Sequence, residues 1–495
     1  MPESLRWLQQ PIGVTIFWLL LAFQVAVLAR AITRRDRTPA SRIAWVAVVL
    51  SLPALGTIAY LLLGETSIGR GRISRLHRAE RMLGAVPTPQ APLLPPAAQL
   101  LSNLCTATNG LGPVGGNRIE LLGSPSASPN EPMLDSDAAI ERLISDIAES
   151  RDHVHISFYI WLDDGNGGRV ADAIAAAALR GVACRVMVDS LGSRSFIRSR
   201  RWQQLREAGV RLLATLDDIP RIRHLALGRL DLRNHRKLVV IDNAIAFCGS
   251  QNCADPEFRV LAKYAPWVDI FLRCEGPVVR QAQWLFLSTW MAETGEELES
   301  LPSQHPLPTF FAQGAVAQMY GCGPSTIGDA MSDSFVGAVY AARRELLITT
   351  PYFVPDEALL RALCAAPRRG VRTTMVFPKR NNSLLVAYAC RSTYRDLLQA
   401  GVSIFEYPLG LLHTKSLTAD GQFSLVGSAN LDRRSLQLNF ENNLLIMDPL
   451  ATSAIKNRQE GYVRVSEQIA LETVEAWPFH TRLLQNAIGM MSPVL

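Results

Sequence analysis

The sequence predicts an α/β fold in which two duplicated α/β/α sandwich domains are related by a pseudo-two-fold axis and follow an N-terminal two-helix transmembrane hairpin. Three observations support this prediction. Two long uncharged stretches lie near the N-terminus, helix and strand patterns alternate from about residue 137 onward, and one polar pattern occurs twice. We expect four parts: a membrane anchor, a linker with an entry segment, and two sandwich domains, at 1–66, 67–133, 134–310 and 311–495.

The N-terminal region contains two stretches that are long enough to cross a bilayer. Residues 7–29 and 43–64 carry no charged side chain, and about 20 apolar residues span a hydrocarbon core of roughly 30 Å. The first stretch could instead be a cleaved signal peptide. A cleavage region would be small and neutral, but this stretch is followed by arginines at 30, 34, 35 and 37. The sequence therefore predicts two spanning helices.

The formal net charge of +6 is concentrated close to these stretches. Residues 1–81 contain eleven Arg and four acidic residues, whereas the remainder is nearly neutral. A nucleic-acid-binding protein usually carries its excess of positive charge on the folded domain, so we expect no nucleic-acid partner. Arginines on the two sides of the spans number five and six, so the positive-inside rule does not decide the orientation.

The eight cysteines contain no C-x-x-C pair and no cluster with zinc spacing. They therefore indicate free thiols in a reducing compartment, which favours the cytoplasmic side for the bulk of the chain. We predict no metal site and no cofactor.

Residues 84–133 are rich in Pro, Gly, Ser and Ala, which is typical of a linker and an entry loop.

The region after the linker consists of two similar halves. In the first half, helix patterns at 137–150, 167–181 and 200–209 alternate with strand patterns at 153–162, 182–190 and 210–215. In the second half, helix patterns at 333–344, 356–370 and 392–401 alternate with strand patterns at 345–354, 371–378 and 402–407. Such self-similarity indicates a duplicated unit, and the alternation predicts a largely parallel or mixed sheet.

In each half these elements are followed by the same pattern, H-x-K-x4-D-x6-G-S-x-N. The first copy contains His235, Lys237, Asp242, Ser250 and Asn252, and the second contains His413, Lys415, Asp420, Ser428 and Asn430. In H-x-K on a strand the two side chains share one face, while the intervening residue points to the other. A pseudo-two-fold axis would bring both copies to one point.

Two lysines and two asparagine amides that converge on one point form a phosphate site, to which the serine hydroxyls can add hydrogen bonds. Two histidines across a phosphate can divide a displacement reaction. One attacks phosphorus as a neutral imidazole, and the other protonates the leaving alkoxide. This division requires one neutral and one charged histidine, and nearby carboxylates can establish that difference. Asp242 and Asp420 complete the repeated pattern, so we include them with the histidines and lysines among the candidate catalytic residues. We nevertheless expect their side chains to point away or to lie in the following turn, mainly with a structural role.

These residues resemble the signature of the phospholipase D superfamily, the doubled H-x-K-x4-D motif. The segments "SRIAWVAVVLSLPALGTIAYLLLGE", "FYIWLDD", "TTPYFVPDEALL" and "SANLDRRSLQLNFE" further resemble bacterial cardiolipin synthases of that superfamily. The resemblance implies two phospholipase D-type domains and a phosphatidyltransferase. It would join two phosphatidylglycerol molecules into cardiolipin, release glycerol and pass through a phosphatidyl-histidine intermediate.

The resemblance also implies roles for individual residues. His235 would be the nucleophile and His413 the acid and base, while Lys237, Lys415, Asn252 and Asn430 match the phosphate-binding positions. Asp269 and Glu441 would be the acidic residues that orient the histidines, Asp269 in the first half and Glu441 in the second. The implied partners are phosphatidylglycerol, other anionic phospholipids and the membrane, and the implied location is the bacterial inner membrane, as a multi-pass protein.

The tract at 221–237 carries six Arg or Lys. It is interpreted either as a surface for anionic headgroups or as a solvated basic loop. Three other functions stay open at this point: a phospholipase D-type hydrolase or nuclease, a phosphatidylserine-type synthase with a nucleotide-linked donor, and an inactive membrane-tethered lipid-binding protein.

Overall fold

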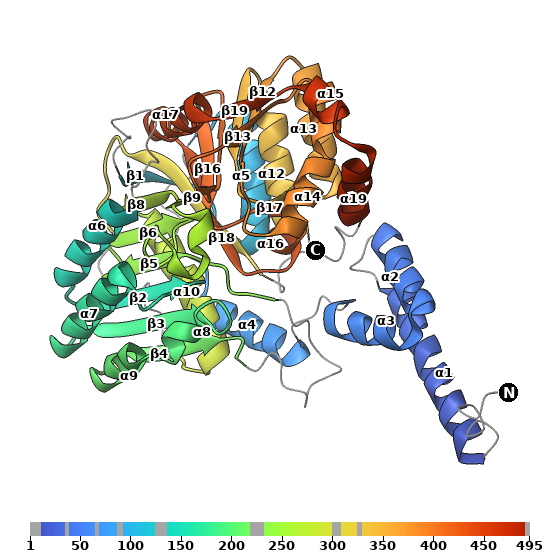
Figure 1. Cartoon of the computed structure of the whole chain (residues 1–495). Helices are drawn as coiled ribbons and strands as arrows, with labels where there is room; N and C mark the ends of the chain where they lie inside the picture. The colour runs from blue at the N-terminus through green and yellow to red at the C-terminus, as the bar shows by residue number, and fades with distance from the viewer. Residues whose placement is uncertain are drawn as a thin grey trace. The chain divides into compact units, whose positions relative to one another are not determined.

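The computed structural model (Figure 1) describes residues 11–34, 39–64, 69–86, 93–123, 136–217, 232–298, 308–323 and 329–490. The chain divides into two compact units. One contains the described residues up to 64, and the other contains residues 71–217 together with 233–490. The basic tract predicted at 221–237 lies mostly outside the described residues.

The N-terminal unit consists of helix α1 (Pro11–Thr33), helix α2 (Pro39–Ser51), helix α3 (Pro53–Ala59) and a π-helical turn, Tyr60–Gly64. Within the described residues one helix, Val14–Thr33, is long and apolar enough by length and composition to cross a membrane. Most of its large apolar side chains are exposed, as they would be in a helix that faces lipid.

The second predicted span, 43–64, is not one continuous helix in the structure. It breaks between α2 and α3 at Leu52, whose φ of −131° and ψ of 74° are not helical. Leu52 precedes Pro53, and proline disfavours the helical conformation of the residue before it and lacks a backbone N–H. The predicted two-helix hairpin is therefore not confirmed, although Trp45 of α2 packs edge-on against Tyr60 and forms a small core there.

The second unit is built on one mixed sheet of fifteen described strands. In the first half these are β1 (Val114–Leu121), β2 (His153–Phe158), β3 (Ala183–Asp189), β4 (Arg211–Thr215), β5 (Leu238–Ile241), β6 (Ile245–Gly249) and β8 (Phe271–Glu275). In the second half they are β9 (Ala315–Cys322), β10 (Glu345–Thr349), β12 (Arg372–Pro378), β13 (Ser403–Tyr407), β15 (Ser416–Ala419), β16 (Phe423–Gly427), β18 (Glu441–Met447) and β19 (Glu467–Ile469).

The order of these strands supports the predicted duplication. From one edge the sheet runs β4-β3-β2-β5-β6-β8-β1, and it continues as β9-β18-β16-β15-β10-β12-β13, ending at β19. The second series is the first in reverse, strand for strand. The two halves meet where β1 pairs antiparallel with β9. The duplicated domains therefore share a single sheet.

Helices cover both faces of each half (Figure 1). In the first half α6 (Ser136–Ala148), α7 (Gly165–Leu179) and α9 (Arg200–Glu207) pack on one face. On the other face packs α10 (Val278–Thr294), which is buried from Val278 to Ala292. In the second half α12 (Ala330–Ala341), α13 (Glu357–Arg368) and α15 (Tyr394–Gln399) cover one face, and α17 (Pro449–Val465) covers the other. The predicted α/β/α layers are thus present in both halves.

The predicted linker at 67–133 is partly wrong. Helix α4 (Arg70–Leu83) contacts the end of α10 through an ion pair between Arg72 and Glu293 at 2.7 Å. Helix α5 (Pro96–Asn109) places Leu101 and Cys105 in the core of the second half, and β1 is a central strand. Within the described part of this segment, Pro96 begins α5 and Gly110 ends it with a φ of 76°, so these two residues mark the ends of a helix.

The glycines of the repeated pattern allow a close approach of strands. Gly427 ends β16, and a Cβ built on it would lie 2.0 Å from Asn443 Oδ1 and 2.3 Å from the Asn442 carbonyl of β18. We therefore expect Gly427→Ala to lower the free energy of unfolding by about 1–3 kcal/mol, as measured by denaturant unfolding in detergent. Gly112→Ala, where the added Cβ meets nothing within 4 Å, serves as the control. Equal stability of the two variants would contradict this explanation.

Candidate active site

The two histidine motifs lie in extended segments that lead into strands. His235 and Lys237 immediately precede β5, whereas His413 and Lys415 lie between β14 (Leu411–Leu412) and β15. The predicted alternation of side chains holds there. Arg236 points away from the histidine side and donates to the Leu285 carbonyl and the Thr289 hydroxyl. Thr414 likewise turns away and contacts the Tyr462 hydroxyl.

Each motif is held by backbone from the opposite half. His413 N donates to the Val268 carbonyl at 2.8 Å, next to the pairing of β14 with β7 (Trp267–Val268). His235 N donates to the Phe440 carbonyl at 2.9 Å. Val268 and Phe440 stand directly before Asp269 and Glu441. The backbone that anchors each motif therefore also brings a carboxylate to it.

The pairing of histidine and carboxylate crosses between the halves. His235 Nδ1 lies 3.0 Å from Glu441 Oε2, and His413 Nδ1 lies 2.6 Å from Asp269 Oδ1. The resemblance implied Asp269 as the orienting residue of the first half and Glu441 as that of the second, but each contacts the histidine of the other half. A carboxylate on Nδ1 leaves Nε2 of each ring to face the substrate.

The two serines support these carboxylates. Ser250 Oγ donates to Asp269 Oδ1 at 2.5 Å, and Ser428 Oγ donates to Glu441 Oε2. Each hydroxyl also accepts a backbone N–H, from Ile270 and from Asn442 respectively. Because both hydroxyls are engaged as donor and acceptor, the structure places them behind the histidines, which differs from their predicted contact with phosphate.

The lysines are buried beside the histidines, and both are less than 4% exposed. Lys237 Nζ donates to the His235 carbonyl at 2.9 Å. Lys415 Nζ donates to the His413 carbonyl at 2.8 Å and lies 3.1 Å from His413 Nε2. An ammonium group has three N–H donors, so each lysine keeps at least one for an anion.

The asparagine amides complete the group. Asn252 Oδ1 accepts the Ile160 N–H, which orients the amide. The Asn430 amide contacts the Ser435 hydroxyl. Asn430 Nδ2 donates to that hydroxyl at 3.2 Å, which leaves its second N–H for an anion.

Burial determines the protonation of this group. It lowers the pKa of His235 to about 4 and that of His413 to about 3. The paired carboxylates oppose this shift, and the lysines of both halves add to it. Burial also lowers the pKa of Lys237 to about 8 and of Lys415 to about 7. Without a ligand both histidines are therefore neutral near pH 7, in contrast to the predicted division into one neutral and one charged ring.

Three aromatic residues that sequence reasoning did not single out enclose the histidines. The Tyr159 ring stands edge-on at 4.8 Å from His235, the Trp267 ring lies 4.7 Å from His413, and the Tyr352 ring lies 6.5 Å from His413. Tyr159 and Tyr352 follow corresponding strands, β2 and β10, of the two halves. Their similar placement, shortly after β2 and β10, was the signal that could have identified them.

Asp242 and Asp420 lie in turns beyond the motif strands. Asp242 accepts the N–H groups of residues 151, 152 and 153, and Asp420 accepts those of residues 343, 344 and 345, at 2.7–2.9 Å. Each has a positive φ, of 52° and 56°. The structure does not bring these carboxylates to the histidines, which agrees with the structural role expected for them and not with their inclusion among the catalytic residues.

Within the described part of the chain, no group of three or more His, Cys, Asp and Glu is arranged to hold a metal ion.

Two histidine–lysine motifs joined through one mixed sheet define a phospholipase D-like protein, and comparisons with known proteins agree. The family model described as "Cardiolipin synthase, PLD-like domain" matches residues 143–262 and 337–461, and "Phospholipase_D-nuclease N-terminal" matches residues 22–65. The solved phosphatidylserine synthase of Haemophilus influenzae shares the fold, with a TM-score of 0.57 and 13% identity over 81% of this chain and 100% of that chain.

Closer relatives are curated proteins. Cardiolipin synthase A of Proteus mirabilis and that of Klebsiella pneumoniae (strain 342) are each 37% identical to this chain, over 97% of both sequences. The chain therefore belongs to the cardiolipin synthase family of phospholipase D-like proteins.

A stability measurement can distinguish a structural role of Asp242 and Asp420 from a role in the reaction. We expect Asp420→Ala to lower the free energy of unfolding by about 1–3 kcal/mol, because three backbone N–H groups lose a charged acceptor. Transfer activity per folded molecule should change little. Asp396→Ala, at an exposed carboxylate on α15, is the control. Loss of activity at unchanged stability would instead give Asp420 a part in the reaction.

Proposed function

We propose that this chain transfers the phosphatidyl group of one phosphatidylglycerol to a hydroxyl of a second, which produces cardiolipin and releases glycerol. Membership of the cardiolipin synthase family supports the reaction class, and the paired histidine–carboxylate contacts support the chemistry. A nitrogen nucleophile, a proton donor and two ammonium groups in one buried site are the groups that a phosphodiester exchange requires.

His235 is the proposed nucleophile. In the described structure its Nδ1 contacts Glu441, and no hydrogen bond occupies its Nε2. The Nε2 of His413, in contrast, lies 3.1 Å from the Lys415 ammonium, so its lone pair is already engaged. His235 Nε2 attacks phosphorus of the first lipid, the phosphorus–oxygen bond to glycerol breaks, and phosphatidyl-histidine forms.

His413 is the proposed acid and base, with Lys415 holding the proton beforehand. Burial lowers the pKa of Lys415 to about 7 and favours a neutral His413, so the proton resides on the lysine in the hydrogen bond between them. An arriving phosphodiester anion stabilises positive charge on the ring. His413 can then protonate the departing glycerol. It later accepts the proton of the second lipid's hydroxyl, whose oxygen attacks phosphorus and breaks the phosphorus–nitrogen bond.

The phosphate is proposed to lie between Lys237 and Lys415, with Asn252 and Asn430 donating amide N–H groups. Both ammonium groups are buried, and a charge-assisted hydrogen bond to an anion is stronger in such surroundings than in water. Neutralisation by the lysines stabilises the additional negative charge that develops on phosphorus-bound oxygens during attack. Asp269 and Glu441 are proposed to orient the rings, and Ser250 and Ser428 to orient those carboxylates.

The membrane arrangement also remains a proposal. Helix α1 supports anchoring in a bilayer, where both lipid substrates reside. We infer an inner-membrane location, with 43–64 as a second span and the second unit on the cytoplasmic side. The eight cysteines, all free thiols, are compatible with a reducing compartment.

Product analysis tests the proposed reaction. Purified protein with labelled phosphatidylglycerol in mixed micelles should give one glycerol for each cardiolipin, quantified by mass spectrometry. We expect His235→Ala and His413→Ala to reduce turnover by about 10³-fold or more, because they remove the nucleophile and the proton carrier. His480→Ala, at an exposed histidine of α19 (Phe479–Met490), is the control. Phosphatidic acid without cardiolipin would identify a hydrolase, and no turnover would favour the inactive lipid-binding alternative.

The pH dependence of kcat/KM tests the protonation states, because this ratio reports the free enzyme. His235 must be neutral, so activity should fall as pH decreases through about 4. Lys237 and Lys415 must be charged, so activity should fall as pH rises through about 7 to 8, more steeply than for a single group. The ratio should be highest near pH 5–7. A constant ratio from pH 6 to 10 would contradict charged lysines as the anion site.

A further inference from the structure

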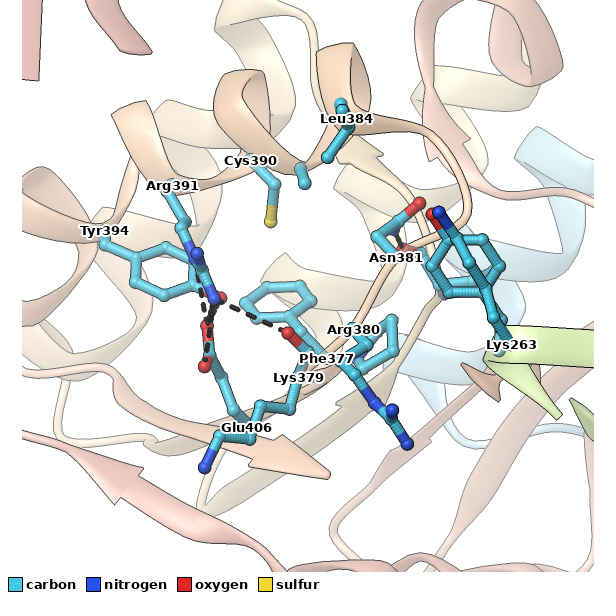
Figure 2. Close-up of a pocket in the computed structure, with 14 residues that line it drawn as sticks. Lys263, Phe377, Lys379, Arg380, Asn381, Leu384, Cys390, Arg391, Tyr394 and Glu406 are labelled. Carbon is cyan, nitrogen blue, oxygen red and sulfur yellow. Dashed lines mark hydrogen bonds and ion pairs between the residues drawn. The ribbon is translucent and has the colours of Figure 1, made fainter. Parts of the chain in front are cut away.

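A separate pocket with a volume of about 370 Å³ opens in the second unit (Figure 2). Its wall comes from the end of β12, the loop that follows it, helix α14 (Leu384–Ser392) and Glu406 of β13. Lys263 and Tyr264 are contributed by the 3-10 helix Arg259–Tyr264 of the first half. The volume lies within the range of sites that hold small ligands.

The pocket is lined by four cationic side chains and one carboxylate. Arg391 pairs with Glu406 at 3.1 Å, and Lys379 pairs with Glu467 at 2.7 Å. Lys263 and Arg380 have no carboxylate partner among the described residues, and Lys263 contacts only the Tyr264 ring as a cation. In Figure 2 these two residues lie on the side of the pocket that carries Asn381, away from the Arg391 and Glu406 pair. The pocket therefore has two cations available for an anion.

Apolar side chains stand exposed next to these cations. Leu384 lines the pocket and is 68% exposed, and its neighbour Leu385 is 50% exposed. On the 3-10 helix that carries Lys263, Val260 is 68% exposed. Exposed aliphatic residues beside unpaired cations are typical of a surface that meets the headgroup region of an anionic bilayer. A free phosphate would need only the cations, so this combination favours a phospholipid.

The pocket adjoins the His413 side of the candidate active site. Pro351 lines it, and Asn381 Nδ2 donates to the Pro351 carbonyl at 2.8 Å. The next residue, Tyr352, donates its hydroxyl to Asn382 at 2.7 Å and places its ring edge-on to His413. The loop that forms the pocket is thus joined through Tyr352 to the proposed acid and base.

We propose that this pocket binds the phosphate-bearing headgroup of the second, acceptor phospholipid, an inference that rests on the proposed function. In the second step the acceptor oxygen attacks phosphorus opposite the bond to His235, the arrangement of an in-line displacement. The acceptor must therefore approach from the His413 side, where it gives its proton to that ring. Lys263 and Arg380 hold its phosphate, and Leu384 and Val260 contact its acyl chains.

The two half-reactions separate this role from a general effect on the active site. With full-length enzyme in excess over labelled phosphatidylglycerol in mixed micelles, glycerol release requires the donor lipid alone. We expect the double variant Lys263→Ala/Arg380→Ala to release glycerol within twofold of the wild-type rate. Its apparent KM for phosphatidylglycerol in cardiolipin formation should rise about tenfold or more, because two charged contacts are lost. A larger share of intermediate should then be hydrolysed to phosphatidic acid.

Control variants and a soluble competitor complete the test. Arg361→Ala, at an exposed arginine that pairs only within its own helix among the described residues, should leave KM unchanged, and Lys263→Arg/Arg380→Lys should retain a near wild-type KM. Inhibition by sn-glycerol 3-phosphate in the wild type but not in the double variant would show recognition of phosphate alone. If that compound has no effect while Leu384→Asn raises KM, recognition requires a lipid in the interface.

Two results would overturn the inference. Glycerol release that slows as much as cardiolipin formation would show that the variant damages the catalytic group, and an unchanged KM would show that the pocket takes no acceptor. A wild-type enzyme that forms no cardiolipin would overturn the proposed function itself. That failure would be recognised before any variant is compared.

Discussion

The crossed contacts between each histidine and the carboxylate of the other half are the constraint on which the rest of the site depends. His235 contacts Glu441, and His413 contacts Asp269, through Nδ1 in both cases. A hydrogen bond at Nδ1 fixes the tautomer and the ring plane, which aims Nε2 into the site. Because the carboxylate comes from the opposite half, neither half alone can form a complete histidine–carboxylate pair.

The sheet provides the rigidity that these contacts require. The pairing of β1 with β9 joins both halves into one sheet. The short pairing of β14 with β7 of the first half holds the start of the second motif against that half. Gly249 and Gly427 let neighbouring strands approach closely where the motifs end. Asp242 and Asp420 fix the turns beyond by accepting three backbone N–H groups each. The proposed catalytic side chains are therefore positioned by strands and by hydrogen-bonded turns, which hold a geometry more closely than irregular surface loops do.

Burial gives the site its chemical character. It disfavours charge on both histidines and on both lysines, so their pKa values all lie below the ordinary ones. An anionic phosphodiester would restore the favourable environment for positive charge that burial removes. In the proposed mechanism, binding of the substrate and protonation of His413 are therefore coupled. The hydrogen bond between Lys415 and His413 joins the two groups between which that proton is proposed to move.

The sequence by itself determined the duplication, the α/β/α layers and the two histidine–lysine motifs, because these follow from periodicity and from spacing along the chain. It also indicated that Asp242 and Asp420 point away from the site or lie in the following turn. Tertiary structure alone decided which carboxylate meets which histidine, since that depends on backbone segments that pair across the two halves and not on distance in sequence. It also decided that β1 and α5 belong to the folded unit, because composition cannot distinguish a proline-rich linker from a helix that begins at proline. The low pKa values of the lysines likewise depend on burial, which arises only when both halves close around them.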